Sequence, residues 1–287
     1  EVGAALSLII PFSASLLFLG FFDQRHTVLA GRPEGEVVSV LWALRRRVLP
    51  VLAAFGLLFM VAILLRTRSR SAWLGTAAAL LLLTSFRRRW LWLGLVLVLL
   101  GGALAQYRLG AEEVLNSILA MGAESNVSAR FEIWQRALYM IQDFPYTGVG
   151  LNAFSPTANV LYPLFSIPPQ RVLQLTHAHN VLLQVAVDVG IPGLVAYLDL
   201  LIGFLVSWAT AHRGLEQGSL RAISVGLLCS MVAYHVYGLT DCITLGAKPG
   251  VVIWAMLGLM AALANLSSAD QAALVQPLGS RARSGTE

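Results

Sequence analysis

Two histidines directly ahead of a long apolar run are the residues of this chain best suited to chemistry. Residues 176–193 read Thr-His-Ala-His-Asn-Val-Leu-Leu-Gln-Val-Ala-Val-Asp-Val-Gly-Ile-Pro-Gly, so His177 and His179 precede a segment apolar enough to enter a membrane. An imidazole titrates near neutral pH, and it can accept a proton from an attacking hydroxyl or orient that hydroxyl. The sequence therefore predicts acid–base chemistry at a membrane surface.

The helical register leaves open which imidazole reacts. If the helix begins near Thr176, His177 shares one stripe with polar residues and His179 points the other way. If the helix begins only at Asn180, His179 lies free in the cap region and Asn180 is a cap or orienting group. The stripe that would include His177 consists of Asn180, Gln184 and Asp188. The motif at 190–193, Gly-Ile-Pro-Gly, is expected to separate this helix from the span that follows.

The composition is that of an integral membrane protein. The chain is 57% hydrophobic and only 12% charged, with a mean hydropathy of +0.73, whereas soluble proteins are about 25% charged. Because a bilayer offers the backbone no water, its spans must be helices of roughly 20 apolar residues. We therefore predict an all-α fold, a polytopic transmembrane helical bundle of about seven spans. The predicted spans are 2–22, 48–65, 71–86, 90–107, 192–210, 222–240 and 249–266.

Basic residues between the spans set the expected topology. The triplets at 45–47 and 87–89 are all arginine and mark the cytoplasmic side, which places 108–178 outside. The net charge of +5 then reflects topology, and no nucleic-acid partner is expected. Because the chain opens with Glu1 inside an apolar run, we expect a fragment that lacks N-terminal helices. The expected divisions are N-terminal helices at 1–107, an external loop domain at 108–178, the His motif with C-terminal helices at 179–266, and a cytoplasmic tail at 267–287.

The external loop is too long for an ordinary connection and is rich in aromatic residues, so we expect it to fold. Residues 124–142 have the spacing of an amphipathic helix, which Pro145 ends. Its expected apolar face consists of Phe131, Trp134, Leu138 and Ile141. Gly148-Val149-Gly150 is a predicted turn.

Arginines on the expected external side suit an anionic ligand. The cluster of Arg66, Arg68 and Arg70 falls outside, against the charge rule, and further arginines lie in the external loop. A guanidinium fork matches phosphate oxygens bidentately, whereas headgroup anchoring or loop packing is the alternative for each residue. The loop arginines are Arg130, Arg136 and Arg171.

A few other polar residues lie in or beside the spans. Asp199 and His235 are inside spans at similar expected depths, so we predict a structural pair, with a proton or ion path as the alternative. Asp241 and Lys248 flank the last external turn and are interpreted as solvated charges. Two further residues, Cys229 and Cys242, are too far apart along one helix to form a disulfide.

The pattern of His179-Asn180, nine residues and then Gly190-Ile191-Pro192-Gly193 resembles the signature of the O-antigen ligase and polymerase superfamily. Ser69-Arg70-Ser71-Ala72 is similar to the family's Ser-Arg-Gly-Ala stretch, with Ser71 in place of Gly. The residues at 130–150 that resemble the family's external-loop element are Arg130, Trp134, Pro145, Gly148 and Gly150. The resemblance covers roughly 66–266.

The resemblance implies a metal-independent glycosyltransferase of the C type in the bacterial inner membrane, with its active site on the external face and no cofactor. The donor would be an undecaprenyl-diphosphate-linked glycan, and the acceptor a hydroxyl of a lipid or glycan. The signature singles out His179 as the catalytic imidazole, with Arg70 and Arg130 holding the diphosphate. Substrate-binding roles are expected for His177, Asn180, Arg68, Arg136 and Arg171, and no metal site is expected.

Other activities fit the same residues. An O-antigen or exopolysaccharide polymerase and a protein O-oligosaccharyltransferase of the same superfamily would use the same donor with another acceptor. From a different class, a transporter or accessory protein, such as an inorganic-carbon transporter, would concentrate its polar residues near the middle of the membrane. The polar residues of this chain gather instead at the expected external surface.

Overall fold

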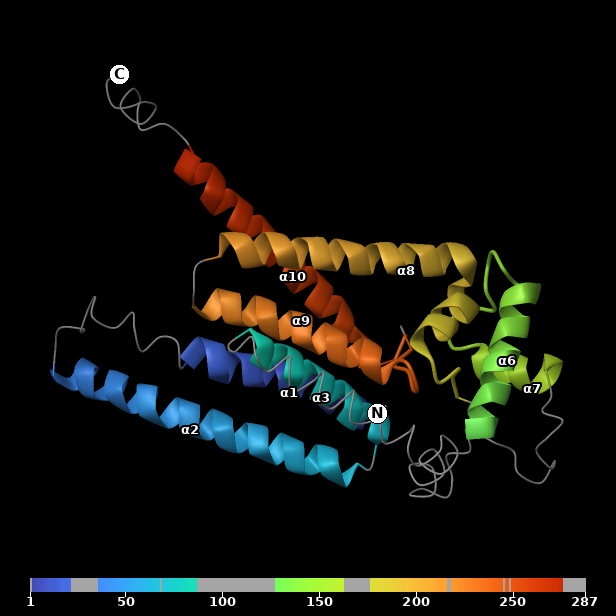
Figure 1. The fold of residues 1–287 in the computed structure, drawn as a ribbon, viewed down its shortest axis with the longest axis horizontal. Coiled ribbons are helices and arrows are strands. Elements are labelled where there is room, and N and C mark those ends of the chain that lie inside the picture. Colours follow the sequence, from blue (N-terminus) through green and yellow to red (C-terminus); the bar gives the residue numbers. More distant parts are fainter. Residues whose placement is uncertain are drawn as a thin grey trace, which may run out of the picture.

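The computed structural model describes residues 2–21, 36–67, 69–86, 127–162, 176–215, 218–244, 246–247 and 249–275, and the regular elements among them are all helical (Figure 1). The all-α prediction is therefore confirmed. The elements are α1 (Val2–Ser15), the π-helical turn η1 (Leu16–Phe21), α2 (Glu36–Arg66), α3 (Arg70–Ser85), α6 (Val127–Asp143), α7 (Phe154–Leu161), α8 (Val181–Gly214), α9 (Ser219–Tyr237) and α10 (Gly250–Val275).

Five segments within the described residues are long and apolar enough to cross a membrane, so this is a multi-pass membrane protein. They begin at Val2, Val48, Val181, Ser219 and Gly250, with mean hydropathies of 1.4 to 2.8. The predicted span at 71–86 corresponds to α3, which is 16 residues long. The predicted span at 90–107 lies outside the described residues, so about seven spans is an approximate count.

α9 is the central helix of the bundle and packs against α1, α3, α8 and α10. Serine hydroxyls connect α9 and α1 in both directions. Ser230 Oγ of α9 donates to the Leu8 carbonyl at 2.6 Å, and Ser15 Oγ of α1 donates to the Ala222 carbonyl of α9 at 2.7 Å. Such small polar contacts hold helices together in lipid. Apolar contact alone gives little preference for helix association there, because the lipid tails are equally apolar. Within the apolar window of α9, 61% of the residues are buried, against 6% for α2, so α2 presents its apolar side chains to lipid.

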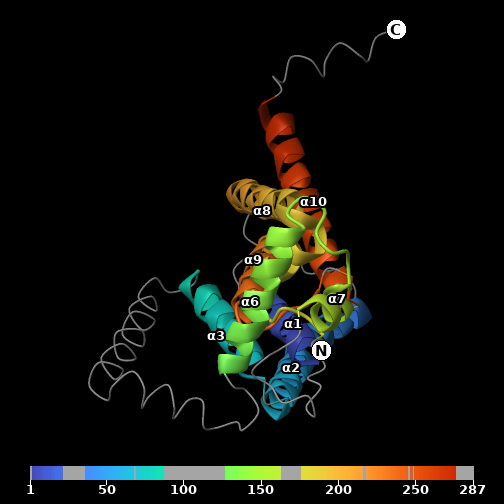
Figure 2. The ribbon, with the colours of Figure 1, turned by 90° about the vertical axis from the view of Figure 1, so that its right-hand side faces the viewer.

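α6 runs across the end of the bundle where α8 begins (Figures 1 and 2). Its buried side chains form one cluster with α7, α8 and the loop before α8, made of Ile133, Ala137, Met140, Phe154, Ala158, Ala178 and Val187. The apolar face predicted from the sequence was wrong, because Phe131 is 60% and Leu138 49% exposed. Two neighbouring stripes of this helix are apolar, and the one with the smaller Ala137 allows closer packing on α8.

α8 is interrupted at Gly190, and the interruption attaches the external segment to the bundle. Gly190 has φ 73° and ψ −178°, which is not a helical conformation. Ile191 N–H donates to the Pro145 carbonyl at 2.7 Å, outside the helix, and Pro192 has no N–H. The carbonyls of Val187 and Asp188 thereby lose their helical donors.

Two N–H groups from the predicted turn at 148–150 replace these donors. Val149 N–H donates to the Val187 carbonyl at 2.8 Å, and Gly150 N–H donates to the Asp188 carbonyl at 3.1 Å. Each backbone group that the break releases is therefore paired again, as a buried backbone requires. The predicted separation of a short helix from the following span is confirmed, and the break also holds the external segment in place.

We predict that Gly190→Ala lowers the melting temperature of the purified protein. A residue with a side chain is strained at φ 73°, ψ −178°, at a cost of about 1–3 kcal/mol. Its Cβ would also lie 2.7 Å from the Tyr146 backbone. The control is Gly203→Ala in the same helix, where an added Cβ meets nothing within 4 Å. Equal melting temperatures for both variants in a thermal-shift assay would contradict this account of the break.

Candidate functional site

The loop that carries both histidines ends at a helix cap. Asn180 Oδ1 accepts from the N–H groups of Leu182 and Leu183, at 3.0 and 3.1 Å, and α8 begins at Val181. His177 and His179 therefore precede the helix, and they do not occupy opposite faces of it. This is the later of the two starts that the sequence left open. His179 itself has a positive φ of 49°, which turns the chain into the cap.

The end of α9 and the loop that follows meet this cap. Val181 N–H donates to the Gly238 carbonyl at 2.7 Å, and Asn180 Nδ2 donates to the Leu239 carbonyl at 3.3 Å. An added Cβ at Gly238 would lie 2.7 Å from a Val181 methyl carbon, so only glycine permits this approach. The contact places Asp241 beside the histidines.

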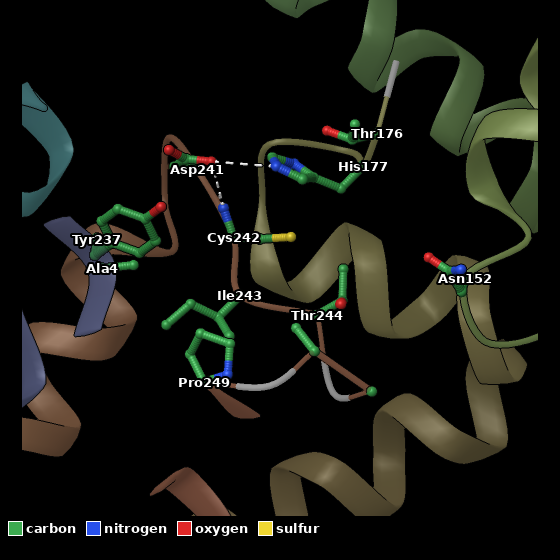
Figure 3. Close-up of a pocket in the computed structure, with 12 residues that line it drawn as sticks. Ala4, Asn152, Thr176, His177, Tyr237, Asp241, Cys242, Ile243, Thr244 and Pro249 are labelled. Carbon is green, nitrogen blue, oxygen red and sulfur yellow. Dashed lines mark hydrogen bonds and ion pairs between the residues drawn. The ribbon is translucent and has the colours of Figure 1, made fainter. Parts of the chain in front are cut away.

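One carboxylate oxygen joins the two imidazoles. Asp241 Oδ1 lies 3.3 Å from His179 Nδ1. The same oxygen lies 3.6 Å from His177 Nε2 and accepts from the Cys242 N–H at 2.9 Å (Figure 3). The two rings lie edge to face, with their centroids 4.3 Å apart. From the sequence we expected Asp241 to be a solvated charge, so its place beside the histidines was not predicted. The available signal was its expected position, just outside a span at the same end of the bundle as the His motif.

The surroundings favour a charged Asp241 beside a neutral His177. Burial alone would raise the pKa of Asp241, but the contacts from His179, Tyr237 and the Cys242 N–H outweigh it and lower the pKa to about 2. Burial and the neighbouring His179 lower the pKa of His177 to about 4, although Asp241 acts in the opposite direction. Near neutral pH the site therefore holds one carboxylate and an uncharged His177.

The hydrogen bonds distinguish the two imidazoles. His177 Nδ1 accepts from the His179 N–H at 3.3 Å, so the proton of the neutral ring is on Nε2, facing Asp241. His179 turns Nδ1 toward Asp241 at an ion-pair distance of 3.3 Å, without an aligned hydrogen bond among the described residues, so a proton on Nδ1 would face the carboxylate and leave Nε2 open. The described residues give this Nε2 no hydrogen-bond partner. Of the two rings, only His177 accepts a hydrogen bond at a ring nitrogen from the described residues.

Two buried polar residues of α8 support the His loop from behind. Gln184 Oε1 accepts from the Ala178 N–H at 2.7 Å, between the two histidines, and Gln184 Nε2 donates to Asp188 Oδ1 at 2.8 Å. Gln184 and Asp188 are only 2% and 1% exposed. Because buried polar networks of this kind fix a single geometry, we expect them to hold the loop in place.

Two of the predicted arginines, Arg70 and Arg130, lie on segments beside Asp241. Arg70 is the first residue of α3. The next residue is Ser71, and its Oγ lies 2.8 Å from Thr240 Oγ1. Arg130 in α6 lies within electrostatic range of Tyr237, which in turn lowers the pKa of Asp241. Both of these arginines are therefore close to the loop that carries the carboxylate.

The other predicted arginines differ. Arg136 is 6% exposed, and burial lowers its pKa while Glu132, one turn earlier, partly restores it. That environment suits packing of α6. Arg68 and Arg171 lie outside the described residues.

A cavity of about 670 Å³ opens beside His177 and Asp241 (Figure 3). Its volume is in the range of ligand sites, about 300–1,000 Å³. The described residues that line it mix small polar and apolar side chains: Ala4, Asn152, Thr176, His177, Tyr237, Asp241, Cys242, Ile243, Thr244, Gly246, Ala247 and Pro249. Hydroxyl and amide groups next to carbon surfaces suit a hydroxyl-bearing ligand.

The predicted pair inside the membrane is not formed. His235 Nε2 lies 3.0 Å from the Tyr197 hydroxyl, its Nδ1 lies 2.8 Å from the Met231 carbonyl, and Asp199 is exposed on α8. Both nitrogens of His235 are thus engaged within the bundle, and Asp199 faces away. Asp199 and Tyr197 are two residues apart along α8, which places them on opposite faces of the helix, and depth in the span alone could not resolve this difference.

Comparison with known protein families gives a match over the middle of the chain. Residues 55–198 match the family described as O-antigen ligase, which is half of the chain and includes α3, α6, the His loop and the break in α8. No curated protein matches the chain.

We predict that removing His177 makes folding less sensitive to acid. The folded state holds the His177 pKa near 4, below its ordinary value of 6.5, so the unfolded chain binds a proton that the fold excludes. Stability is therefore lost as the pH falls from about 6.5 to about 4. Between these values the melting temperature should fall less steeply for His177→Asn than for the wild type. Parallel curves for the two proteins would contradict the buried, neutral state assigned to His177.

Proposed function

The chain belongs to the O-antigen ligase family, and on that premise we propose that it transfers a glycan from a polyprenyl-diphosphate carrier to an acceptor hydroxyl. At the family level it is a membrane glycosyltransferase. The observation that carries the finer proposal is the 3.3 Å contact between Asp241 Oδ1 and His179 Nδ1. It orients an imidazole whose other nitrogen can act as a general base.

The proposed reaction is a direct displacement at the sugar. The acceptor oxygen attacks the anomeric carbon, the bond from this carbon to the diphosphate oxygen breaks, and its electron pair leaves with the diphosphate. The acceptor proton moves to His179 Nε2, and Asp241 stabilises the imidazolium that forms. This step needs no metal.

Arg70 and Arg130 would stabilise the departing diphosphate. Each lies on a segment beside the Asp241 loop, which supports a role on the donor side of the reaction. The acceptor would enter through the cavity, since its described lining carries hydroxyl and amide groups and no arginine. Arg68 and Arg171 stay proposed as donor contacts, and the external loop domain is proposed to exclude water from the donor.

The location of the site on the external face is also a proposal. α2 runs from Glu36 to Arg66, and it begins at the end of the bundle opposite the histidines (Figure 1). The arginines at 45–47 belong to the first half of this helix and therefore lie toward that end. Basic residues favour the cytoplasmic side, which supports an external site in the bacterial inner membrane. The division into N-terminal helices, external loop, His-motif helices and tail is proposed on the same basis.

Ligase, polymerase and protein O-oligosaccharyltransferase activities share this donor chemistry and differ in the acceptor. The transporter alternative is less well supported. His235 is engaged with Tyr197 and Asp199 is exposed, so these two residues form no polar path through the bundle. The polar groups that converge do so at the end of the bundle, beside the cavity.

We predict that His179→Ala lowers the rate of glycan transfer by about 10²–10⁴, because it removes the general base. Asp241→Asn should lower the rate by at least about tenfold, because the amide no longer favours the productive tautomer. The measurement is transfer from an undecaprenyl-diphosphate-linked glycan, in membranes and in cells, with folding checked by monodispersity.

Asp199→Asn is the matched control, since it removes an exposed carboxylate from the same helix that the histidines precede. It should leave transfer unchanged. A folded His179→Ala protein with full transfer would refute the assigned base, and loss of transfer in Asp199→Asn alone would favour the transporter reading.

A further inference from the structure

His177, His179 and Asp241 together have the donor atoms of a metal site. One nitrogen from each ring and one carboxylate oxygen lie within 4.8 Å of one another. Two imidazoles and a carboxylate are a ligand set that zinc and similar divalent ions prefer, whereas Mg²⁺ and Ca²⁺ prefer oxygen ligands alone.

The two separations from Asp241 agree with tetrahedral coordination, and the two ring nitrogens lie within 4.8 Å of each other. Bonds of about 2.0–2.1 Å to a tetrahedral ion place neighbouring ligand atoms about 3.3 Å apart. Asp241 Oδ1 lies 3.3 Å from His179 Nδ1 and 3.6 Å from His177 Nε2. Small rotations of the two rings would therefore bring all three atoms to bonding distance around one ion.

The cluster is also reachable. The side chains of His177, His179 and Asp241 are 20%, 30% and 26% exposed, and the cavity of about 670 Å³ borders His177 and Asp241. An ion can enter through that cavity, and a water molecule or the acceptor oxygen can take a fourth position. Ligands, distances and an entry path are the features that a metal site requires.

We propose that these three residues bind a zinc-class divalent ion, and that the bound ion inhibits the enzyme. The inhibition rests on the proposed function of His179. An ion on Nδ1 of His179 displaces the proton there, and the neutral ring then carries its proton on Nε2. The nitrogen proposed as the base would no longer accept the acceptor proton. Binding would also replace the 3.6 Å contact between His177 Nε2 and Asp241 with bonds from both atoms to the ion.

The first experiment measures binding without any substrate. The full chain, purified with a tag that contains no histidine and placed in lipid nanodiscs, is titrated with Co²⁺ alone, and the visible absorption of the ion is recorded. We expect one Co²⁺ per chain, displaced by Zn²⁺. His177→Ala and Asp241→Asn should each weaken binding by about tenfold or more, since each removes one ligand.

His212→Ala is the control, because it removes a histidine from the other end of α8. Its Co²⁺ affinity should equal that of the wild type. An absence of stoichiometric Co²⁺ binding, or binding that His177→Ala leaves unchanged, would overturn the site.

The second experiment measures glycan transfer with and without Zn²⁺. We expect Zn²⁺ to slow the wild type, EDTA to restore it, and His177→Ala to be less inhibited relative to its own metal-free rate. Transfer that Zn²⁺ leaves unchanged or accelerates would overturn the inhibitory role. Because Co²⁺ binding is measured without donor or acceptor, a failed transferase assignment would leave the metal result intact, and the two failures are distinguishable.

Discussion

The unpaired N–H groups at the start of α8 determine where the chemistry of this protein is located. A helix leaves its first N–H groups without partners, and near a membrane they need partners from the protein. Asn180 satisfies two of them, and the Gly238 carbonyl satisfies that of Val181. The second contact joins the start of α8 to the end of α9, which places Asp241 beside His177 and His179. The site is a consequence of how one helix end is satisfied.

The break at Gly190, ten residues after Asn180, also leaves backbone groups that need hydrogen-bond partners. It releases the carbonyls of Val187 and Asp188, and the turn at 148–150 pairs with them. α6, and with it Arg130, is thereby held at the end of the bundle where the histidines lie. The short helix between cap and break also contains Gln184, which hydrogen-bonds the His loop. Cap, break and loop support thus belong to about three turns of one helix.

Hydropathy and local motifs were sufficient to predict the helical membrane fold, the break in α8 and the cap role of Asn180, because each depends on neighbouring residues. The role of Asp241 was not predictable in this way, since its partners lie about sixty residues earlier in the chain. The predictions of the buried face of α6 and of the partner of His235 were wrong for a related reason. Helix rotation depends on packing, and the apolar residues of a membrane helix cover several faces.

The central claim is that Asp241 holds the proton of His179 on Nδ1 and leaves Nε2 to accept one. Nitrogen NMR of the histidine-labelled protein in bilayers at neutral pH measures this directly. The account predicts that the His179 signals, identified from their loss in His179→Ala, show a protonated Nδ1 and an unprotonated Nε2, and that Asp241→Asn changes this distribution. A neutral His179 ring with its proton on Nε2 in the wild type would contradict it.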